Sequence, residues 1–353
     1  MKVNSGVGGG ATVSPTQPAP APRSSKERLH YIQAMRAIAI VIVVVTHCTA
    51  LLPMGDVVRS PGVHFFFRHI NIVFIFVSGF LFQYLIASFH YSRYLKTKIN
   101  NVILPYLIIS IPALMIYMLG LKDASQAVPA EVAEHSTILL PYMIFTGTQL
   151  GPLWFIPMMA LLYLISPLLH AIDSRPRTYF LIIPLLIVAL LIGRSPDDSN
   201  PFQNAIFYLP VYMIGMAASH FRSGWLGALQ KHWLVMMMLI FIPHFVPPTT
   251  PGWDGMIFLT KIIFCCGLVG MLSRFTSSVP KWIDAVGNAS FGIYFLHGYP
   301  VAALTMIAVG RYTQLTGFSG LMLYSAAVLA ISMTGVWIVK RITGRWSRRI
   351  IGV

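Results

Sequence analysis

Arg36 and His47 are the two ionisable side chains in an otherwise almost wholly apolar stretch, residues 34–52. They are eleven positions apart, which in a helix places them on nearly the same face and about 16 Å apart along the axis. A guanidinium binds phosphate through paired hydrogen bonds, and an imidazole titrates near neutral pH and serves as a general base. The spacing therefore favours an anion site and a base at different depths of one helix.

Each residue also has a structural interpretation. An arginine near a helix end extends readily to lipid headgroups, and a buried histidine is often a hydrogen-bonded core residue. His47 lies too deep in the apolar stretch to reach water easily from either end. Ionisable residues at such depth usually face a protein interior or a watery cavity, which favours a chemical role for His47.

The second apolar stretch offers two weaker candidates. Arg68 precedes it by less than one turn, and it is either an interfacial anchor or a cation that binds substrate or stabilises a developing oxyanion. Ser78 stands beside Gly79, a pair typical of close helix packing. Deeper in the chain, Lys261 lies within an apolar segment, where it either extends to the membrane surface or lines a cavity.

The connection over residues 120–152 is the longest between the apolar segments. Loops longer than about 12–15 residues are usually functional or disordered. One interpretation is a solvated spacer. The other is that residues 146–154 fold back over the outer mouth near His47, where Gln149 and Trp154 offer hydrogen bonds and a stacking face to a bound substrate.

The composition requires a membrane. Apolar residues are 56% of the 353 and charged residues 10%, against about 25% charged in an ordinary soluble domain. Mean hydropathy is +0.72. We expect an all-α polytopic protein of about ten transmembrane helices with both termini cytoplasmic. Ten apolar segments indicate this: 34–52, 70–89, 102–119, 153–170, 179–192, 204–218, 233–246, 256–272, 291–309 and 321–339.

Three parts follow from this pattern: a disordered cytoplasmic tail over 1–30, one transmembrane domain over 31–345, and a basic cytoplasmic C-terminus over 346–353. Lys and Arg concentrate in alternate loops, which sets the orientation. The net charge of +15 is dispersed over those loops. It therefore indicates contact with anionic membrane lipid and not with nucleic acid.

Metal and disulfide chemistry are not expected. The three cysteines, Cys48, Cys265 and Cys266, all lie in apolar segments without disulfide or zinc spacing. There is no HExxH motif, and no carboxylates are paired within an apolar segment. We therefore expect no metal.

Several blocks resemble the membrane-bound acyltransferase family 3 in order along the chain. The first is Arg, ten residues, then His in the first apolar segment. The others are the FIFVSGF block at 74–80, Leu-Pro-Tyr at 104–106, Leu-Trp-Phe at 153–155, and SFGIY at 290–294 followed by His297. Each block is weak alone, but five in this order are fairly specific.

The resemblance implies a bacterial inner-membrane O-acyltransferase with acetyl-CoA as donor. His47 matches the catalytic histidine, Arg36 and His297 are expected to bind the donor, and Ser78 is expected to line a cavity. The acceptor would be a sugar hydroxyl of an exopolysaccharide or lipid-linked saccharide, with polysaccharide biosynthesis machinery as a possible partner. The alternative function is a multi-pass transporter or proton-coupled carrier of a small or lipid-linked substrate, in which Arg36, His47 and Lys261 line a substrate or proton path.

Overall fold

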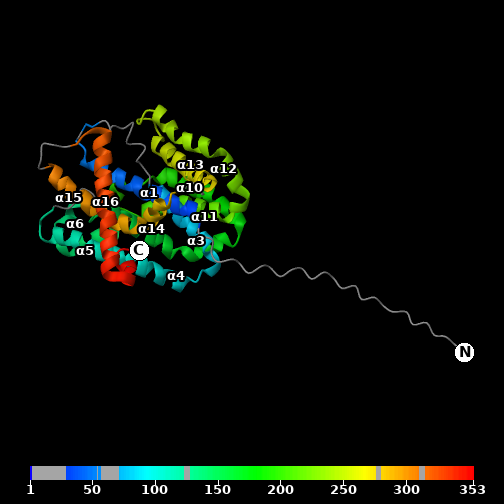
Figure 1. Ribbon diagram of the computed structural model, residues 1–353, viewed down its shortest axis with the longest axis horizontal. Helices are drawn as coiled ribbons and strands as arrows, with labels where there is room; N and C mark the ends of the chain where they lie inside the picture. The colour runs from blue at the N-terminus through cyan, green and yellow to red at the C-terminus, as the bar shows by residue number, and fades with distance from the viewer. Residues whose placement is uncertain (2–28, 54, 57–70, 123–127, 276–279, 310–314) are drawn as a thin grey trace.

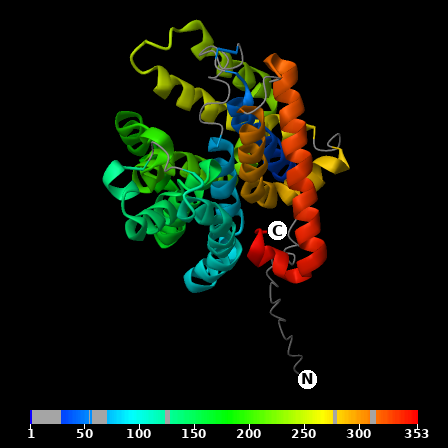
Figure 2. The same cartoon turned by 90° about the vertical axis from the view of Figure 1, so that its left-hand side faces the viewer.

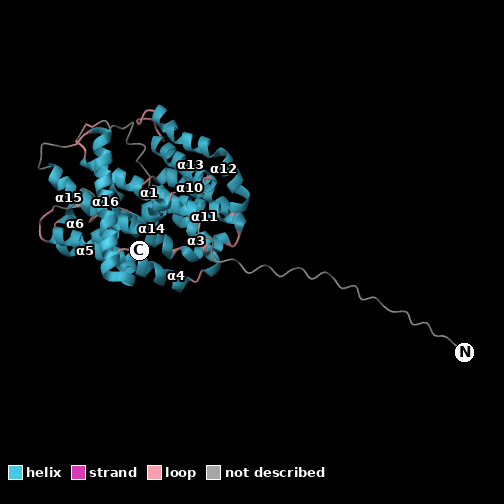
Figure 3. Cartoon of the chain, viewed as in Figure 1, coloured by secondary structure: helices cyan, strands magenta, loops and turns pink. Residues whose placement is uncertain are grey.

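A computed structural model describes residues 1, 29–53, 55–56, 71–122, 128–275, 280–309 and 315–353. Within these ranges all the regular structure is helical (Figure 3). The predicted all-α class is therefore confirmed. Two predictions lie outside the described residues: most of the N-terminal tail, and Arg68.

The described helices differ in length. The longer ones are α1 (His30–Cys48), α3 (Ile72–Tyr84), α5 (Leu104–Met118), α11 (Pro201–His220), α12 (Arg222–Met238), α13 (Trp253–Arg274), α14 (Lys281–Leu296) and α16 (Gly317–Thr343). The shorter ones are α4 (Tyr91–Lys98), α6 (Ala130–Ala133), α7 (Ser136–Thr146), α8 (Phe155–Leu164), α9 (Ser166–Asp173), α10 (Ile182–Ile192), α15 (Gly298–Val309) and α17 (Ser347–Ile350). Single turns or short non-α stretches that matter below are η4 (Ile99–Ile103), η5 (Gly151–Trp154), η6 (Pro176–Leu181), η8 (Leu239–Phe245) and η10 (Gly344–Trp346).

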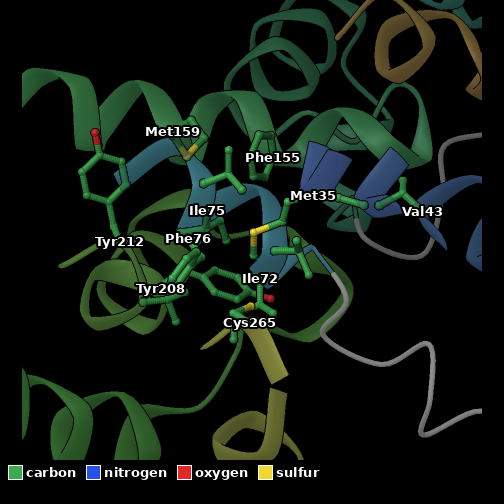
Figure 4. Packing of buried hydrophobic residues seen from close by; sticks show 14 of the residues in the cluster. Met35, Val43, Ile72, Ile75, Phe76, Phe155, Met159, Tyr208, Tyr212 and Cys265 are labelled. Carbon is green, nitrogen blue, oxygen red and sulfur yellow. The ribbon is translucent and has the colours of Figure 1, made fainter. Parts of the chain in front are cut away.

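Helix α1 lies at the centre of the bundle. It contacts α3, α13, α14, α15 and α16 (Figure 1). Its side chains Met35 and Val43 pack in the same core as Ile72 and Phe76 of α3 (Figure 4). Helix α1 contains no Gly or Pro and is packed among apolar side chains, and it is regular from His30 to Cys48. Arg36 and His47 therefore lie on one unbroken helix.

Helices α3 and α11 touch backbone to backbone. A methyl group added at Gly79 of α3 would overlap the carbonyl oxygen of Tyr212, and one at Gly215 of α11 would overlap the carbonyl oxygen of Phe76. Small residues allow the two backbones to approach this closely. Lipid is as apolar as the helix surfaces, so the hydrophobic effect does not drive membrane helices together, and close van der Waals packing stabilises their contact instead. The crossing holds α3 in place, and α1 packs against α3.

The two ends of the bundle are distinguished by the residues of α1. The Arg36 end holds the C-terminal ends of α3 and α16 and the segment 344–353, whereas the His47 end holds the beginning of α16. Figure 2 shows α16 running between these ends, with the C-terminus at the Arg36 end. The segment 344–353 does not extend away: Ile351 is buried, and α17 packs on α5 and η4.

Five described helices are long and apolar enough to cross a membrane, and the number rises to eight if each bent pair forms one span. The bends are 68° between α7 and η5–α8, 119° between α9 and η6–α10, and 54° between α14 and α15. The multi-pass class is thus confirmed, while ten spans and the orientation stay predictions.

One predicted boundary is wrong. The segment placed at 233–246 begins at Arg222, because α12 and η8 together form a helix of 24 residues, Arg222–Phe245. Its first three turns contain Arg222, Gln230 and Lys231. These polar residues lower the mean hydropathy of the segment, so hydropathy alone does not locate the start of the helix.

Candidate functional site

Arg36 opens into a cavity of about 260 Å³ between α1, α3, α14 and the C-terminal residues; we call it the Arg36 cavity. It is lined by Arg36, Phe74, Val77, Ser78, Leu81, Thr97, Lys98, Asn101, Val102, Phe155, Tyr163, Ser290, Phe291, Tyr294 and Gly352. The Arg36 Nη1 donates to Gln33 Oε1 at 3.3 Å, and Gln33 Nε2 donates to Asn288 Oδ1 at 2.8 Å. This relay orients the guanidinium from the α14 side.

A second cavity of about 330 Å³, the Arg93 cavity, adjoins the first. The two share Ser78, Leu81, Thr97 and Lys98 as walls. The Lys98 ammonium lies 5.2 Å from the ring centroid of Tyr94 and 4.6 Å from that of Tyr163, which holds its position by cation–π attraction.

The lining charges of these two cavities have one sign. Arg36, Arg93 and Lys98 line them, and the described lining contains no carboxylate. Such a surface suits an anion with several charges, since each cation contributes a charge-assisted hydrogen bond.

His47 opens into a larger cavity of about 650 Å³ at the other end of α1, here the His47 cavity. It is lined by Val43, Thr46, His47, Asn71, Gly151, Trp154, Leu190, Gly193, Arg194, Ser195, Pro196, Asp197, Asp198, Phe207, Asp254 and Gly255. The lining is mixed, with hydroxyl, carboxylate, guanidinium and apolar groups. A polyhydroxyl compound fits such a surface because it presents both hydrogen-bonding groups and apolar faces.

His297 lies beside His47, with ring centroids 5.2 Å apart. Its Nδ1 lies 2.7 Å from the carbonyl oxygen of Tyr294 and 3.1 Å from that of Ile293. Carbonyl oxygens only accept, so Nδ1 carries the proton and Nε2 carries the lone pair. Among the described residues Nε2 has no hydrogen-bond partner, although it is buried.

A series of rings separates the Arg36 cavity from the His47 cavity. Phe155 contacts Tyr294 with centroids 5.6 Å apart, Tyr294 contacts His297 at 6.0 Å, and His297 contacts His47. Tyr294 also donates a hydrogen bond to the carbonyl oxygen of Pro152, which ties α14 to η5. In the part of the chain that the structure describes, no residue lines both cavities.

The structure brings some predicted residues together and separates others. Ser78 lines the Arg36 and Arg93 cavities, not the His47 cavity. Trp154 lines the His47 cavity, but its ring is stacked on Tyr208 at 6.0 Å and covered by Arg194 at 4.9 Å. Lys261 is buried within α13 and lines none of the three cavities.

The segment 146–154 reaches the His47 cavity through Gly151 and Trp154. Gln149 does not. Its side chain is buried, and its Nε2 donates to Tyr106 Oη at 3.0 Å and to Ser110 Oγ at 2.7 Å. The amide therefore fastens the segment to α5, and both of its N–H donors are used within the protein.

Sequence reasoning missed two cationic positions. These are Lys98 and Arg194, whose positions in connecting segments predict only a part in setting the orientation. For Lys98 the available signal was its place one turn after Arg93 and Tyr94, just before Leu-Pro-Tyr. For Arg194 the signal was the compact GRSPDD run, in which an arginine precedes two aspartates by a helical turn's length.

The family model for an acyltransferase domain matches residues 29–341. The chain belongs to acyltransferase family 3. Comparisons with curated proteins and with solved structures found no match. Membership establishes a membrane acyltransferase and confirms the resemblance drawn from the five sequence blocks.

Proposed function

We propose that the protein transfers an acetyl group from cytoplasmic acetyl-CoA to a sugar hydroxyl on the other side of the membrane. The observation that carries the proposal is the division of α1 between two chemically different cavities. Arg36 opens into a cationic pair of cavities, and His47 opens into a separate, mixed polar cavity.

The cationic cavities suit the phosphates of coenzyme A. Arg36, Arg93 and Lys98 stand where a phosphate-bearing cosubstrate would enter from the Arg36 end. Coenzyme A is long and thin, so its phosphates can stay at this end while the pantetheine arm carries the thioester toward His47, about 16 Å along α1. On this account the ring of Tyr294 and its neighbours must move to admit the arm.

The chemistry at His47 is general-base acyl transfer. A sugar hydroxyl is a poor nucleophile until a base removes its proton during attack. His47 takes that proton as the hydroxyl oxygen bonds to the thioester carbon, and returns it to the departing thiolate. His297 packs against His47, with ring centroids 5.2 Å apart, and this contact restricts the orientation of the His47 imidazole.

The cavity and the family both support a sugar as the acceptor class. A volume of about 650 Å³ with carboxylates, hydroxyls and apolar walls suits one or two sugar rings. An exopolysaccharide or lipid-linked saccharide of a bacterial inner membrane is the acceptor that we propose.

The direct test uses purified protein in detergent with radiolabelled acetyl-CoA and an alkyl glycoside as acceptor. Transfer should label the glycoside and release one free thiol per acetyl group. His47→Gln should lower the rate by about 10²–10⁴-fold, as removal of a general base typically does. His135→Gln, which changes an exposed histidine that lines none of the three cavities, is the control. Normal transfer by His47→Gln would overturn the role of His47, and no thiol release by the wild type with any tested glycoside would contradict sugar acylation.

A further inference from the structure

The loop between α10 and α11 places one permanent positive charge at the His47 cavity. Arg194 Nε donates to Asp198 Oδ1 at 2.6 Å, and Nη2 donates to Asp198 Oδ2. The guanidinium carbon lies 4.9 Å from the ring centroid of Trp154. Among the described residues around this cavity, Arg194 is the one Lys or Arg side chain.

The loop is built to hold this arrangement. Asp197 and Asp198 both have positive φ, 51° and 58°, which costs a non-glycine residue about 1–2 kcal/mol each. The buried Asn204 accepts a hydrogen bond from the Ser195 N–H at 3.1 Å, and Asn200 N–H donates to Ser195 Oγ at 3.0 Å. Backbone strain that the surroundings enforce is commonly found at functional sites.

Acyl transfer at His47 needs a second group besides the base. When the hydroxyl attacks, the thioester carbonyl oxygen becomes an oxyanion, and a positioned donor must stabilise it. Arginine has five N–H groups, and Asp198 uses two of them. Three remain for a ligand in the cavity, which the imidazole of His47 also lines.

We propose that Arg194 stabilises the oxyanion of the acyl-transfer step and that Asp198 is its positioning residue. This inference rests on the proposed function. The hydroxyl oxygen bonds to the carbonyl carbon, His47 takes the proton, and the carbonyl π electrons move to the oxygen that Arg194 hydrogen-bonds. The intermediate then collapses, the carbon–sulfur bond breaks, and the thiolate takes the proton from His47.

Two other roles for Arg194 make different predictions. A cation that binds an anionic group of the acceptor would change the KM for the acceptor. A cation that only closes the loop would change the folding of the protein, and any loss of activity would follow the loss of folded protein. An oxyanion donor changes kcat, because the charge that it meets exists only during the reaction.

The test measures kcat, acceptor KM, coenzyme A affinity and melting temperature in detergent for Arg194→Gln, Arg194→Lys and the control Arg175→Gln, an exposed arginine at the Arg36 end. We expect Arg194→Gln to lower kcat by about 10²–10³-fold with the other three quantities unchanged. Arg194→Lys should retain part of the rate, since it keeps the charge but loses the paired contact with Asp198. If Arg194→Gln folds poorly, Arg194→Ala with millimolar methylguanidinium should regain rate.

A double-mutant cycle tests the role of Asp198. Asp198→Asn alone should lower kcat, and it should cause no further loss in the Arg194→Gln background, because it acts only through Arg194. A raised acceptor KM with normal kcat, a loss that tracks melting temperature alone, or additive effects of the two substitutions would overturn the proposal. A wild-type protein that transfers no acetyl group would instead contradict the proposed function.

Discussion

At the scale of single residues, Lys98 is the cation shared by the Arg36 and Arg93 cavities. Loss of one charge-assisted hydrogen bond costs about 1.5–3 kcal/mol, so Lys98→Met should weaken coenzyme A binding by about 10- to 100-fold. Lys96→Met removes the same charge from an exposed position on the same helix and should leave the affinity unchanged. Titration of both purified variants decides this, and equal affinities would remove Lys98 from the donor site.

The residue scale also shows what the sequence could predict. Arg36 and His47 were accessible because a regular helix converts eleven positions into a fixed face and distance. Arg194 was not, because its place at the cavity depends on a loop with two positive-φ aspartates and on the stacking of Trp154. The position of Gln149 was not predictable for a similar reason, because its partners Tyr106 and Ser110 come from a helix about forty positions earlier in the chain.

At the scale of elements, the α3–α11 crossing depends on two glycines. Gly79→Ala should sharply lower the yield and melting temperature, because the methyl group would overlap the Tyr212 carbonyl. A methyl group added at Gly227 in α12 would meet no atom within 4 Å. Gly227→Ala should therefore be neutral or slightly stabilising, since alanine favours the helix over glycine by up to about 1 kcal/mol. Size-exclusion profiles and thermal unfolding in detergent check the pair. Equal stability of the two variants would contradict the close crossing.

The C-terminal turn is a wall of the Arg36 cavity. A methyl group at Gly352 would overlap the ring of Phe291 and approach the Asn101 carbonyl at 3.2 Å. We therefore expect Gly352→Ala to weaken coenzyme A binding. Gly344→Ala is matched to it, because this residue also has positive φ but nothing within 4 Å. If both substitutions lower the affinity equally, backbone strain and not the cavity wall is responsible.

Hydropathy predicts where helices occur in this chain, but not where they bend or begin. The ten apolar segments each contain helix, because apolar length alone marks a buried or membrane helix. The 119° bend before α10 and the early start of α12 were not predicted. Both depend on tertiary packing of short or polar stretches, which hydropathy does not register.

At the scale of the whole molecule, the account needs the Arg36 end to face the cytoplasm. Ser174 is exposed near the Arg36 end, and Thr250 is exposed at the His47 end. In intact cells, a membrane-impermeant maleimide should label Thr250→Cys, and it should label Ser174→Cys only after permeabilisation. The opposite pattern would reverse the orientation that the Lys and Arg distribution predicts.

The central claim is that donor binding and acyl transfer are divided between the two ends of α1. The most direct measurement compares coenzyme A affinity and transfer rate for Arg36→Ala, Arg36→Lys and His47→Gln in the same detergent. We expect Arg36→Ala to weaken coenzyme A binding by about 10- to 100-fold, with Arg36→Lys intermediate because the bidentate fork is lost. His47→Gln should bind coenzyme A normally and lose about 10²–10⁴-fold in rate. Unchanged affinity in Arg36→Ala, or weakened affinity in His47→Gln, would contradict the division of α1 into a donor end and a transfer end.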